Sequence, residues 1–164
     1  VPMAWNSYLT RLERGECFPP TNEAEMRYFV FSECLDLMRK RWFKTPYQIF
    51  AEDPAAAKAG KADLALGLLE EGRFVAIEFK YSTKIKKVKE DILKLRRTVE
   101  SKATCGFFLM LTDATCKYQV NLVLKALGIE EDGKYSKFQW ETVRPPGFDV
   151  LLEALIVSLC SQTD

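Results

Sequence analysis

Two strand-like runs separated by a short, glycine-containing gap constrain the fold of this chain more than any other feature. Residues 62–69 and 73–81 are rich in apolar side chains, and Glu70-Glu71-Gly72 separates them. A gap this short joins neighbouring antiparallel strands, so the sequence predicts a β-hairpin. Because side chains alternate between the two faces of a strand, the pairing register decides which residues share a face.

The register of this hairpin determines whether three charged residues meet. Asp63 stands near the start of the first strand, and Glu78 and Lys80 stand two residues apart near the end of the second. A loop at positions 70 and 71 puts Asp63 opposite Glu78, and a loop at positions 71 and 72 puts it opposite Lys80. Either loop places all three on one face, where opposed Cβ atoms are about 5 Å apart. A three-residue loop would separate them, because it shifts the pairing by one residue.

Helix-type and strand-type runs alternate along the rest of the chain. Helices are expected over residues 5–12, 22–43, 85–102, 113–126 and 148–160, and further strands over 47–51, 106–111 and 138–143. The order αα-βββ-α-β-α-β-α predicts an α/β (mixed α+β) protein, with a central mixed β-sheet of four to five strands flanked by helices. A length of 164 residues suits one domain spanning the chain.

The composition removes several function classes. The chain has no histidine, which excludes a Ser-His-Asp triad, a Cys-His pair and an H-E-x-x-H zinc site. Five scattered cysteines without a C-x-x-C pair favour reduced thiols in a cytoplasmic protein over a disulfide framework or a zinc cluster. No apolar run approaches the roughly 20 residues of a membrane helix, so we expect no membrane partner.

Two carboxylates and a lysine on one face suit metal-assisted hydrolysis of phosphodiesters. Mg²⁺ prefers oxygen ligands and usually takes one or two protein carboxylates together with substrate phosphate. Asp63 and Glu78 would bind Mg²⁺, or Mn²⁺ in its place, and the backbone carbonyl of Phe79 is a further candidate ligand. Lys80 would orient the attacking water or stabilise charge on the phosphate. The simpler alternative is a solvated strand face with cross-strand ion pairing.

Positive charge is concentrated directly after this strand, although the whole chain carries a formal charge of only +1. Residues 80–97 contain eight Lys or Arg and two acids, a local net charge of +6. Phosphate backbones are bound through such clusters. DNA is therefore the expected partner, contacted by Lys84, Lys86, Lys87 and Lys89. The alternative is a solvated helix face, because Lys86, Glu90 and Lys94 are spaced for ion pairs.

The hairpin residues resemble the PD-(D/E)xK nuclease superfamily. The segment Gly60-Lys61-Ala62-Asp63-Leu64 and the later Val75-Ala76-Ile77-Glu78-Phe79-Lys80 are similar to many bacterial and phage members, although Ala62 stands where the family name has proline. The resemblance covers about residues 22–113 and leaves 114–164 as a C-terminal extension packing on that core. It implies a restriction endonuclease-like fold and a metal-dependent DNA endonuclease. In that enzyme Asp63 and Glu78 bind Mg²⁺ and Lys80 assists hydrolysis.

The resemblance also implies a glutamate at the metal early in the first core helix. Glu25 matches that position, but a capping box with Asn22 explains it equally well. Two other functions stay open beside the DNA nuclease. One is a catalytically weak or inactive module of the same fold that binds DNA or assembles with a partner. The other is an RNA-directed nuclease, which the lack of a histidine ligand disfavours. A homodimer also stays open, because two-fold dimers suit enzymes that cut both strands.

Overall fold

The computed structural model describes residues 1–41, 48–51, 63–68, 73–81, 85–101, 103, 105–114, 120–127 and 136–160. The helices in these ranges are α1 (Pro2–Glu13), α2 (Glu23–Arg41), α3 (Ile85–Ser101) and α4 (Val120–Leu127). The strands are β1 (Gln48–Ala51), β2 (Leu64–Leu68), β3 (Arg73–Tyr81), β4 (Cys105–Asp113), β5 (Ser136–Val143) and β6 (Leu152–Cys160). No helix in the described part is both long and apolar enough to cross a membrane.

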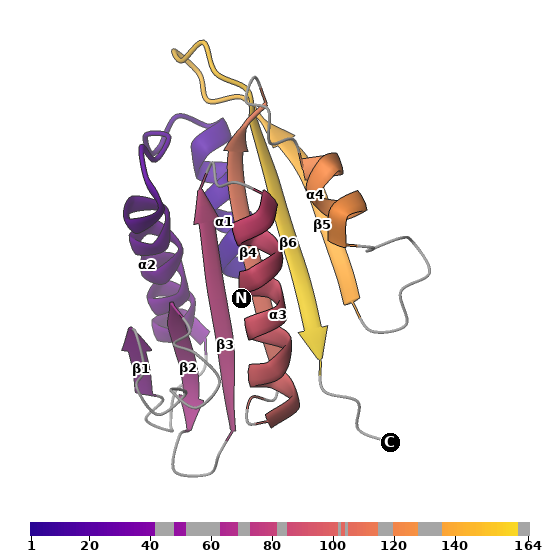
Figure 1. Ribbon diagram of the computed structural model, residues 1–164. Helices are drawn as coiled ribbons and strands as arrows, with labels where there is room; N and C mark the ends of the chain where they lie inside the picture. Colours follow the sequence, from indigo (N-terminus) through magenta and orange to yellow (C-terminus); the bar gives the residue numbers. More distant parts are fainter. Residues whose placement is uncertain are drawn as a thin grey trace.

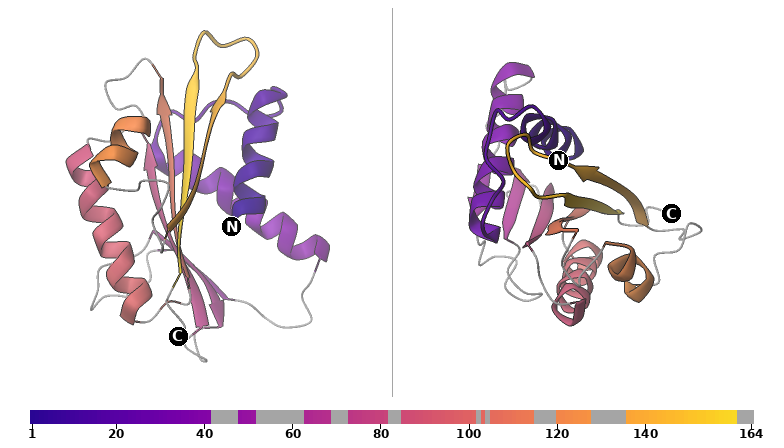
Figure 2. Two further views of the ribbon diagram at one scale, coloured as in Figure 1. Left: turned by 90° about the vertical axis from the view of Figure 1, so that its right-hand side faces the viewer. Right: turned by 90° about the horizontal axis from the view of Figure 1, so that it is seen from above.

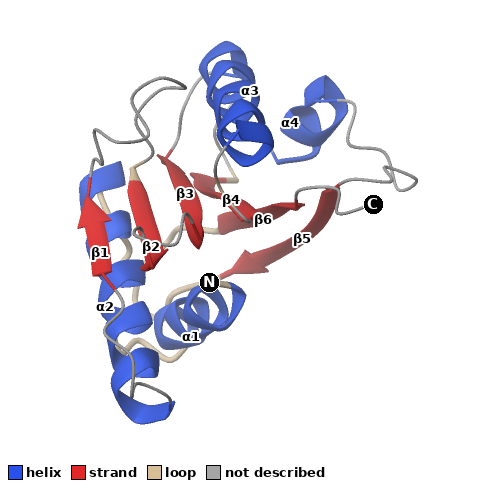
Figure 3. Cartoon of the chain, turned by 90° about the horizontal axis from the view of Figure 1, so that it is seen from below, coloured by secondary structure: helices blue, strands red, loops and turns tan. Residues whose placement is uncertain are grey.

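The strands form one six-stranded mixed sheet between two layers of helices (Figure 1). Its order is β1-β2-β3-β4-β6-β5, in which β3 and β4 are parallel and the other neighbours are antiparallel. Helices α1 and α2 cover one face, and α3 and α4 cover the other (Figures 2 and 3). The expected mixed sheet flanked by helices is confirmed, with six strands in place of four to five.

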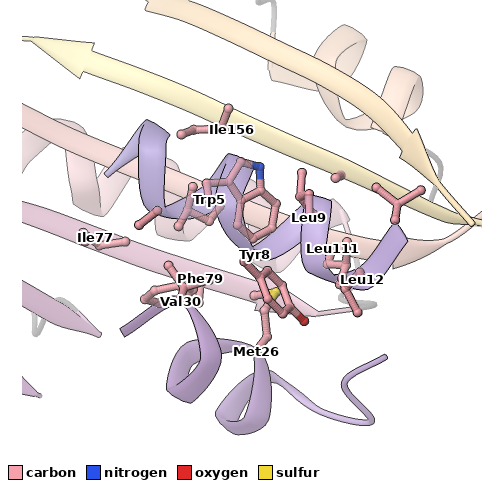
Figure 4. Close-up of a cluster of buried hydrophobic side chains, with 14 of the residues drawn as sticks. Trp5, Tyr8, Leu9, Leu12, Met26, Val30, Ile77, Phe79, Leu111 and Ile156 are labelled. Carbon is pink, nitrogen blue, oxygen red and sulfur yellow. The ribbon is translucent and has the colours of Figure 1, made fainter. Parts of the chain in front are cut away.

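The face under α1 and α2 carries an apolar core (Figure 4). Trp5 and Tyr8 from α1 are each 1% exposed, and Met26 from α2 is fully buried. They pack near Ile77 and Phe79, which β3 directs to this face. Burying a large apolar side chain contributes about 1.5–3 kcal/mol, so this layer accounts for much of the stability of the fold.

The opposite face packs α3 closely against the sheet. A stripe of apolar side chains at helical spacing, including Val88, Ile92 and Leu95, is buried there. Gly106 of β4 lies directly beneath the helix, where an added Cβ would stand 2.7 Å from Cγ2 of Val99. The missing side chain at this position lets α3 approach β4. The order β3-α3-β4 forms a crossover between parallel strands, as expected for such a unit.

The C-terminal region corrects two expectations. Residues 148–160 were expected to form a helix, but residues 152–160 form strand β6, which lies between β4 and β5. Leu152 to Val157 are all buried, because both sheet faces are covered at this point. A fully buried strand shows no alternation and cannot be distinguished by periodicity from a buried helix. The helix expected from Asp113 begins instead at Val120, because β4 continues to Asp113 by pairing with β6.

Candidate active site

The β2–β3 hairpin adopts the first of the two expected registers. Leu64 pairs with Ile77, and the pairing continues to Leu68 and Arg73. Continuing this register by one residue sets Asp63 opposite Glu78. Asp63 itself lies just before β2, where its Oδ2 accepts a hydrogen bond of 2.8 Å from the backbone N–H of Phe79. The register prediction is therefore confirmed, and this hydrogen bond anchors Asp63 beside β3.

Glu78 and Lys80 lie on the face of β3 that α3 covers. They follow Phe74 and Ala76, which belong to the apolar core beneath α3, at the two-residue spacing of one strand face. Each is only 3% exposed, and Lys80 Nζ lies 3.4 Å from Glu78 Oε1. The apolar core on this face thus gives way to a buried ion pair towards the C-terminal end of β3.

Three further oxygen groups surround the ammonium of Lys80. Lys80 Nζ donates to the carbonyl oxygen of Phe79 at 2.6 Å and to Glu23 Oε2, from the first turn of α2, at 3.5 Å. Asp91 Oδ2, from α3, lies 3.2 Å away on an ion-pair contact. The Phe79 carbonyl, expected as a metal ligand, thus accepts a hydrogen bond from lysine in this structure. The ammonium sits at a junction of β3, α2 and α3.

A second lysine approaches Glu78 from α3. Lys94 Nζ lies 3.3 Å from Glu78 Oε2 and 3.5 Å from Glu78 Oε1. Its side chain keeps 27% of its surface exposed, whereas the Glu78 side chain keeps 4%. Lys94 therefore connects the buried carboxylate to the solvent-facing side of α3.

Burial and neighbouring charges set the protonation of this cluster. Burial raises the pKa of Glu78 to about 7, and the negative charge of Asp63 adds to the effect, while Lys80 and Lys94 oppose it. For Lys80, burial lowers the pKa, but the carboxylates around it, led by Glu78 and Asp63, outweigh burial and leave the pKa raised. Lys80 is therefore charged at neutral pH, and Glu78 is poised between its two forms.

The structure brings Asp63, Glu78 and Lys80 together but does not bring Glu25 to them. The Glu25 carboxylate is exposed and accepts hydrogen bonds from the backbone N–H of Thr21 at 2.7 Å and from Thr21 Oγ1 at 3.0 Å. Asn22 Oδ1 accepts the Glu25 backbone N–H at 2.9 Å, so these residues cap the start of α2. Glu23 reaches Lys80 instead. Two residues are about 200° apart around a helix, so Glu23 and Glu25 point to opposite sides.

The expected DNA-contacting lysines lie at the start of α3. Lys86, Lys87 and Lys89 are exposed there, and Lys84 lies outside the described residues. Their helix is the one that carries Asp91 and Lys94 into the cluster.

Sequence reasoning missed Glu23, Asp91 and Lys94. For Asp91 a signal exists, since it follows Val88 by three residues and precedes Ile92, which puts it beside the buried stripe of a helix that is otherwise basic. An acid at core spacing needs a buried partner, and Lys80 is the nearest cation in the preceding strand. Lys94 and Glu23 show no comparable signal, because their contacts depend on how the helices pack.

The cluster fits a divalent cation in charge and in donor type. Within the described ranges no three Asp, Glu or Cys side chains form a ready-made metal cluster. However, among the described residues Glu23, Asp63, Glu78 and Asp91 lie near two ammonium groups, those of Lys80 and Lys94, which gives these six groups a net charge of −2 when all are ionised. Asp91 Oδ2 is buried and, apart from its ion-pair contact with Lys80, has no hydrogen-bond partner among the described residues. Asp63 and Glu78 are the oxygen donors that would hold Mg²⁺, which needs few protein ligands.

Comparison with protein-family models, curated proteins and solved structures finds no match to this chain. The resemblance to the PD-(D/E)xK superfamily therefore rests on the hairpin residues alone.

Proposed function

We propose that this protein is a Mg²⁺-dependent nuclease of the PD-(D/E)xK type that hydrolyses DNA phosphodiester bonds. The observation that carries the proposal is the hydrogen bond from the Phe79 N–H to Asp63, in a register that sets Asp63 opposite the buried Glu78. Repulsion between the two carboxylates and the burial of Glu78 are both unfavourable. A divalent cation bound by both carboxylates would offset these terms, and such perturbed groups are common at functional sites.

Each residue has a part in the proposed reaction. Asp63 and Glu78 would hold Mg²⁺, which when bound lowers the pKa of water and neutralises charge on the phosphate. Lys80 places a buried positive charge beside Glu78 and so favours the ionised form of that carboxylate, against burial and the charge of Asp63. The cover of α3 limits water around Glu78, and electrostatic interactions are stronger where water is excluded.

Nicking of supercoiled plasmid in Mg²⁺ tests the catalytic proposal, with single-stranded DNA and RNA as parallel substrates. We expect cleavage that EDTA abolishes and that Asp63→Asn and Glu78→Gln each remove. Asp149→Asn is the matched control, because Asp149 is an exposed carboxylate in the loop between β5 and β6 and should not matter. Absence of cleavage on every substrate by the unmutated protein contradicts the proposal.

Binding of DNA is the second part of the proposal. The exposed Lys86, Lys87 and Lys89 would neutralise phosphates, so affinity for a duplex should fall steeply as salt is added. Replacing all three with alanine should weaken binding and reduce the slope of log Kd against log salt. An unchanged slope would assign binding to a different surface.

One observation favours a non-catalytic alternative. Lys80 and Lys94 already pair with Glu78, so the cluster is partly neutralised without a metal. A protein that uses the fold only to bind DNA or to assemble with a partner would keep such pairs as structure. Thermal melting separates the two: a metal site should raise Tm in Mg²⁺ by the linkage relation, and Asp63→Asn should remove that rise. DNA binding without a Mg²⁺ effect on Tm and without cleavage would favour the module.

A further inference from the structure

Two lysines contact the same buried carboxylate from different elements, and they differ in their access to solvent. The Lys80 side chain, from β3, is 3% exposed, while the Lys94 side chain, from α3, is 27% exposed. A residue that meets a phosphate must be reachable from outside. This difference therefore bears on which lysine serves the proposed reaction.

The ammonium of Lys80 is enclosed by the protein. An ammonium has three N–H donors. Lys80 Nζ makes three hydrogen bonds, to Phe79 O, Glu78 Oε1 and Glu23 Oε2, at 2.6, 3.4 and 3.5 Å. Asp91 Oδ2 stands beside it at 3.2 Å. These four oxygen groups enclose an ammonium whose side chain is only 3% exposed, so a group arriving from solvent does not reach it.

Lys94 is held more loosely. In the described part of the chain its Nζ contacts only the Glu78 carboxylate, at 3.3 and 3.5 Å. These distances, like two of the Lys80 contacts, lie beyond the usual 2.7–3.2 Å range of N–H···O hydrogen bonds, so the two lysines differ in their exposure and in the number of groups around them. At least one N–H and the exposed part of the side chain remain available. Lys94 also belongs to the helix whose first turns carry the exposed lysines.

We infer that Lys94 is the lysine that contacts the substrate phosphate, and that Lys80 is an internal cation that holds the buried carboxylates in place. This assignment rests on the proposed nuclease function, and it moves to Lys94 the role that the E-x-K motif suggests for Lys80. The Lys94 ammonium would exchange its contact with Glu78 for a non-bridging phosphate oxygen. It would stay protonated throughout and stabilise the negative charge that develops during hydrolysis.

Lysine labelling tests the assignment without requiring catalysis. The metal-free protein is acetylated briefly, with and without a duplex oligonucleotide, and each lysine is quantified by mass spectrometry. We expect Lys94 to be labelled and then protected by the duplex, and Lys80 to stay unlabelled in both samples. Lys125, exposed on α4, is the control whose labelling should not change. Equal labelling of Lys94 with and without DNA overturns the assignment.

Kinetics of the same proteins provide the second test. Removing a donor that stabilises developing charge typically lowers kcat by about 100-fold or more, so Lys94→Met should show that loss. Lys94→Arg should recover part of the rate, and Lys125→Met should equal the unmutated enzyme. Lys80→Met should instead lower Tm, since it leaves buried carboxylates without their cation. A Lys94→Met kcat within about threefold of the unmutated value overturns the inference, whereas failure of the unmutated protein to cleave contradicts the proposed function itself.

Discussion

Strand β3 places apolar side chains on one face of the sheet and charged side chains on the other. Ile77 and Phe79 face α1 and α2 and are fully buried in an apolar core, whereas Glu78 and Lys80 face α3 and are almost as buried among charges. Burial stabilises the first pair through the hydrophobic effect and opposes the second through desolvation. The comparison indicates that the apolar face stabilises the fold and so offsets the desolvation of the charged groups on the other face.

The α1/α2 face also carries a buried carboxylate, but it is handled differently. Glu33 of α2 accepts hydrogen bonds from Ser7 and Arg11, both on α1, and the pair joins the two helices at the border of the core. Arg11 also contacts the half-exposed carboxylate of Glu16 at 3.8 Å. Glu33 therefore links α1 to α2 through an ion pair and a hydrogen bond, whereas Glu78 lies near Asp63, Asp91 and two lysines.

The largest loss of stability is expected from a substitution on the apolar face. Phe79→Ala should lower the free energy of unfolding by about 3–5 kcal/mol, because it removes a fully buried ring and leaves a cavity. Urea unfolding followed by circular dichroism measures this loss. The matched control is Phe148→Ala, at a ring that is 42% exposed, which should change stability far less. Similar losses in the two variants would break the comparison.

A second change acts on the packing of the charged face. Gly106→Ala places a methyl group 2.7 Å from Val99 Cγ2 and should destabilise the fold by about 1–3 kcal/mol, because α3 must move outward. Val99→Ala in the same chain removes the clashing methyl, so the double variant should lose less than the sum of the single losses. Strict additivity in urea unfolding would show that α3 does not pack on Gly106 as described.

The charged face of β3 should make the stability of the protein depend on pH, because Glu78 lies there. The pKa of Glu78 is raised from 4.5 to about 7 on folding. A raised folded pKa stabilises the protein below the unfolded pKa, and that contribution is lost as the pH rises through about 7. Between pH 5 and 7 the metal-free protein should lose about 2 kcal/mol relative to Glu78→Gln. Urea unfolding in EDTA at both values measures the difference, with Glu90→Gln on the exposed side of α3 as control. Parallel pH profiles would contradict this interpretation of Glu78.

The smallest change in stability is expected at the Arg11–Glu33 ion pair between α1 and α2. Arg11→Met should cost about 1 kcal/mol or less, because the Arg11 side chain is 42% exposed and solvent screens its ion pair. Ser7 keeps one hydrogen bond to Glu33 in that variant. Thermal unfolding checks the value. A loss approaching that of Phe79→Ala would mean that charge, and not apolar packing, dominates this face.

Local pattern predicted most of the fold and the centre of the site. The alternation in β3 placed Glu78 and Lys80 on one face, and the short hairpin gap predicted the register that brings Asp63 beside β3. The predictions failed where the structure of a segment, or the neighbours of a side chain, depend on elements distant in the sequence. β6 resembles a helix because its Leu and Ala residues are helix formers and its burial on both sides removes the alternation. Glu23 and Lys94 join the site only through the packing of α2 and α3, which spacing along one element does not reveal.

The position of β6 has a consequence for how the chain assembles during synthesis. β4 pairs with β3, which precedes it, and with β6, which follows only after α4 and β5. As the chain emerges from the ribosome, one edge of β4 stays open until residues 152–160 arrive, although α3 can already pack on its face. An open apolar edge is a template for pairing with other chains. A chain that stops before β6 should therefore aggregate while still containing every residue of the candidate active site.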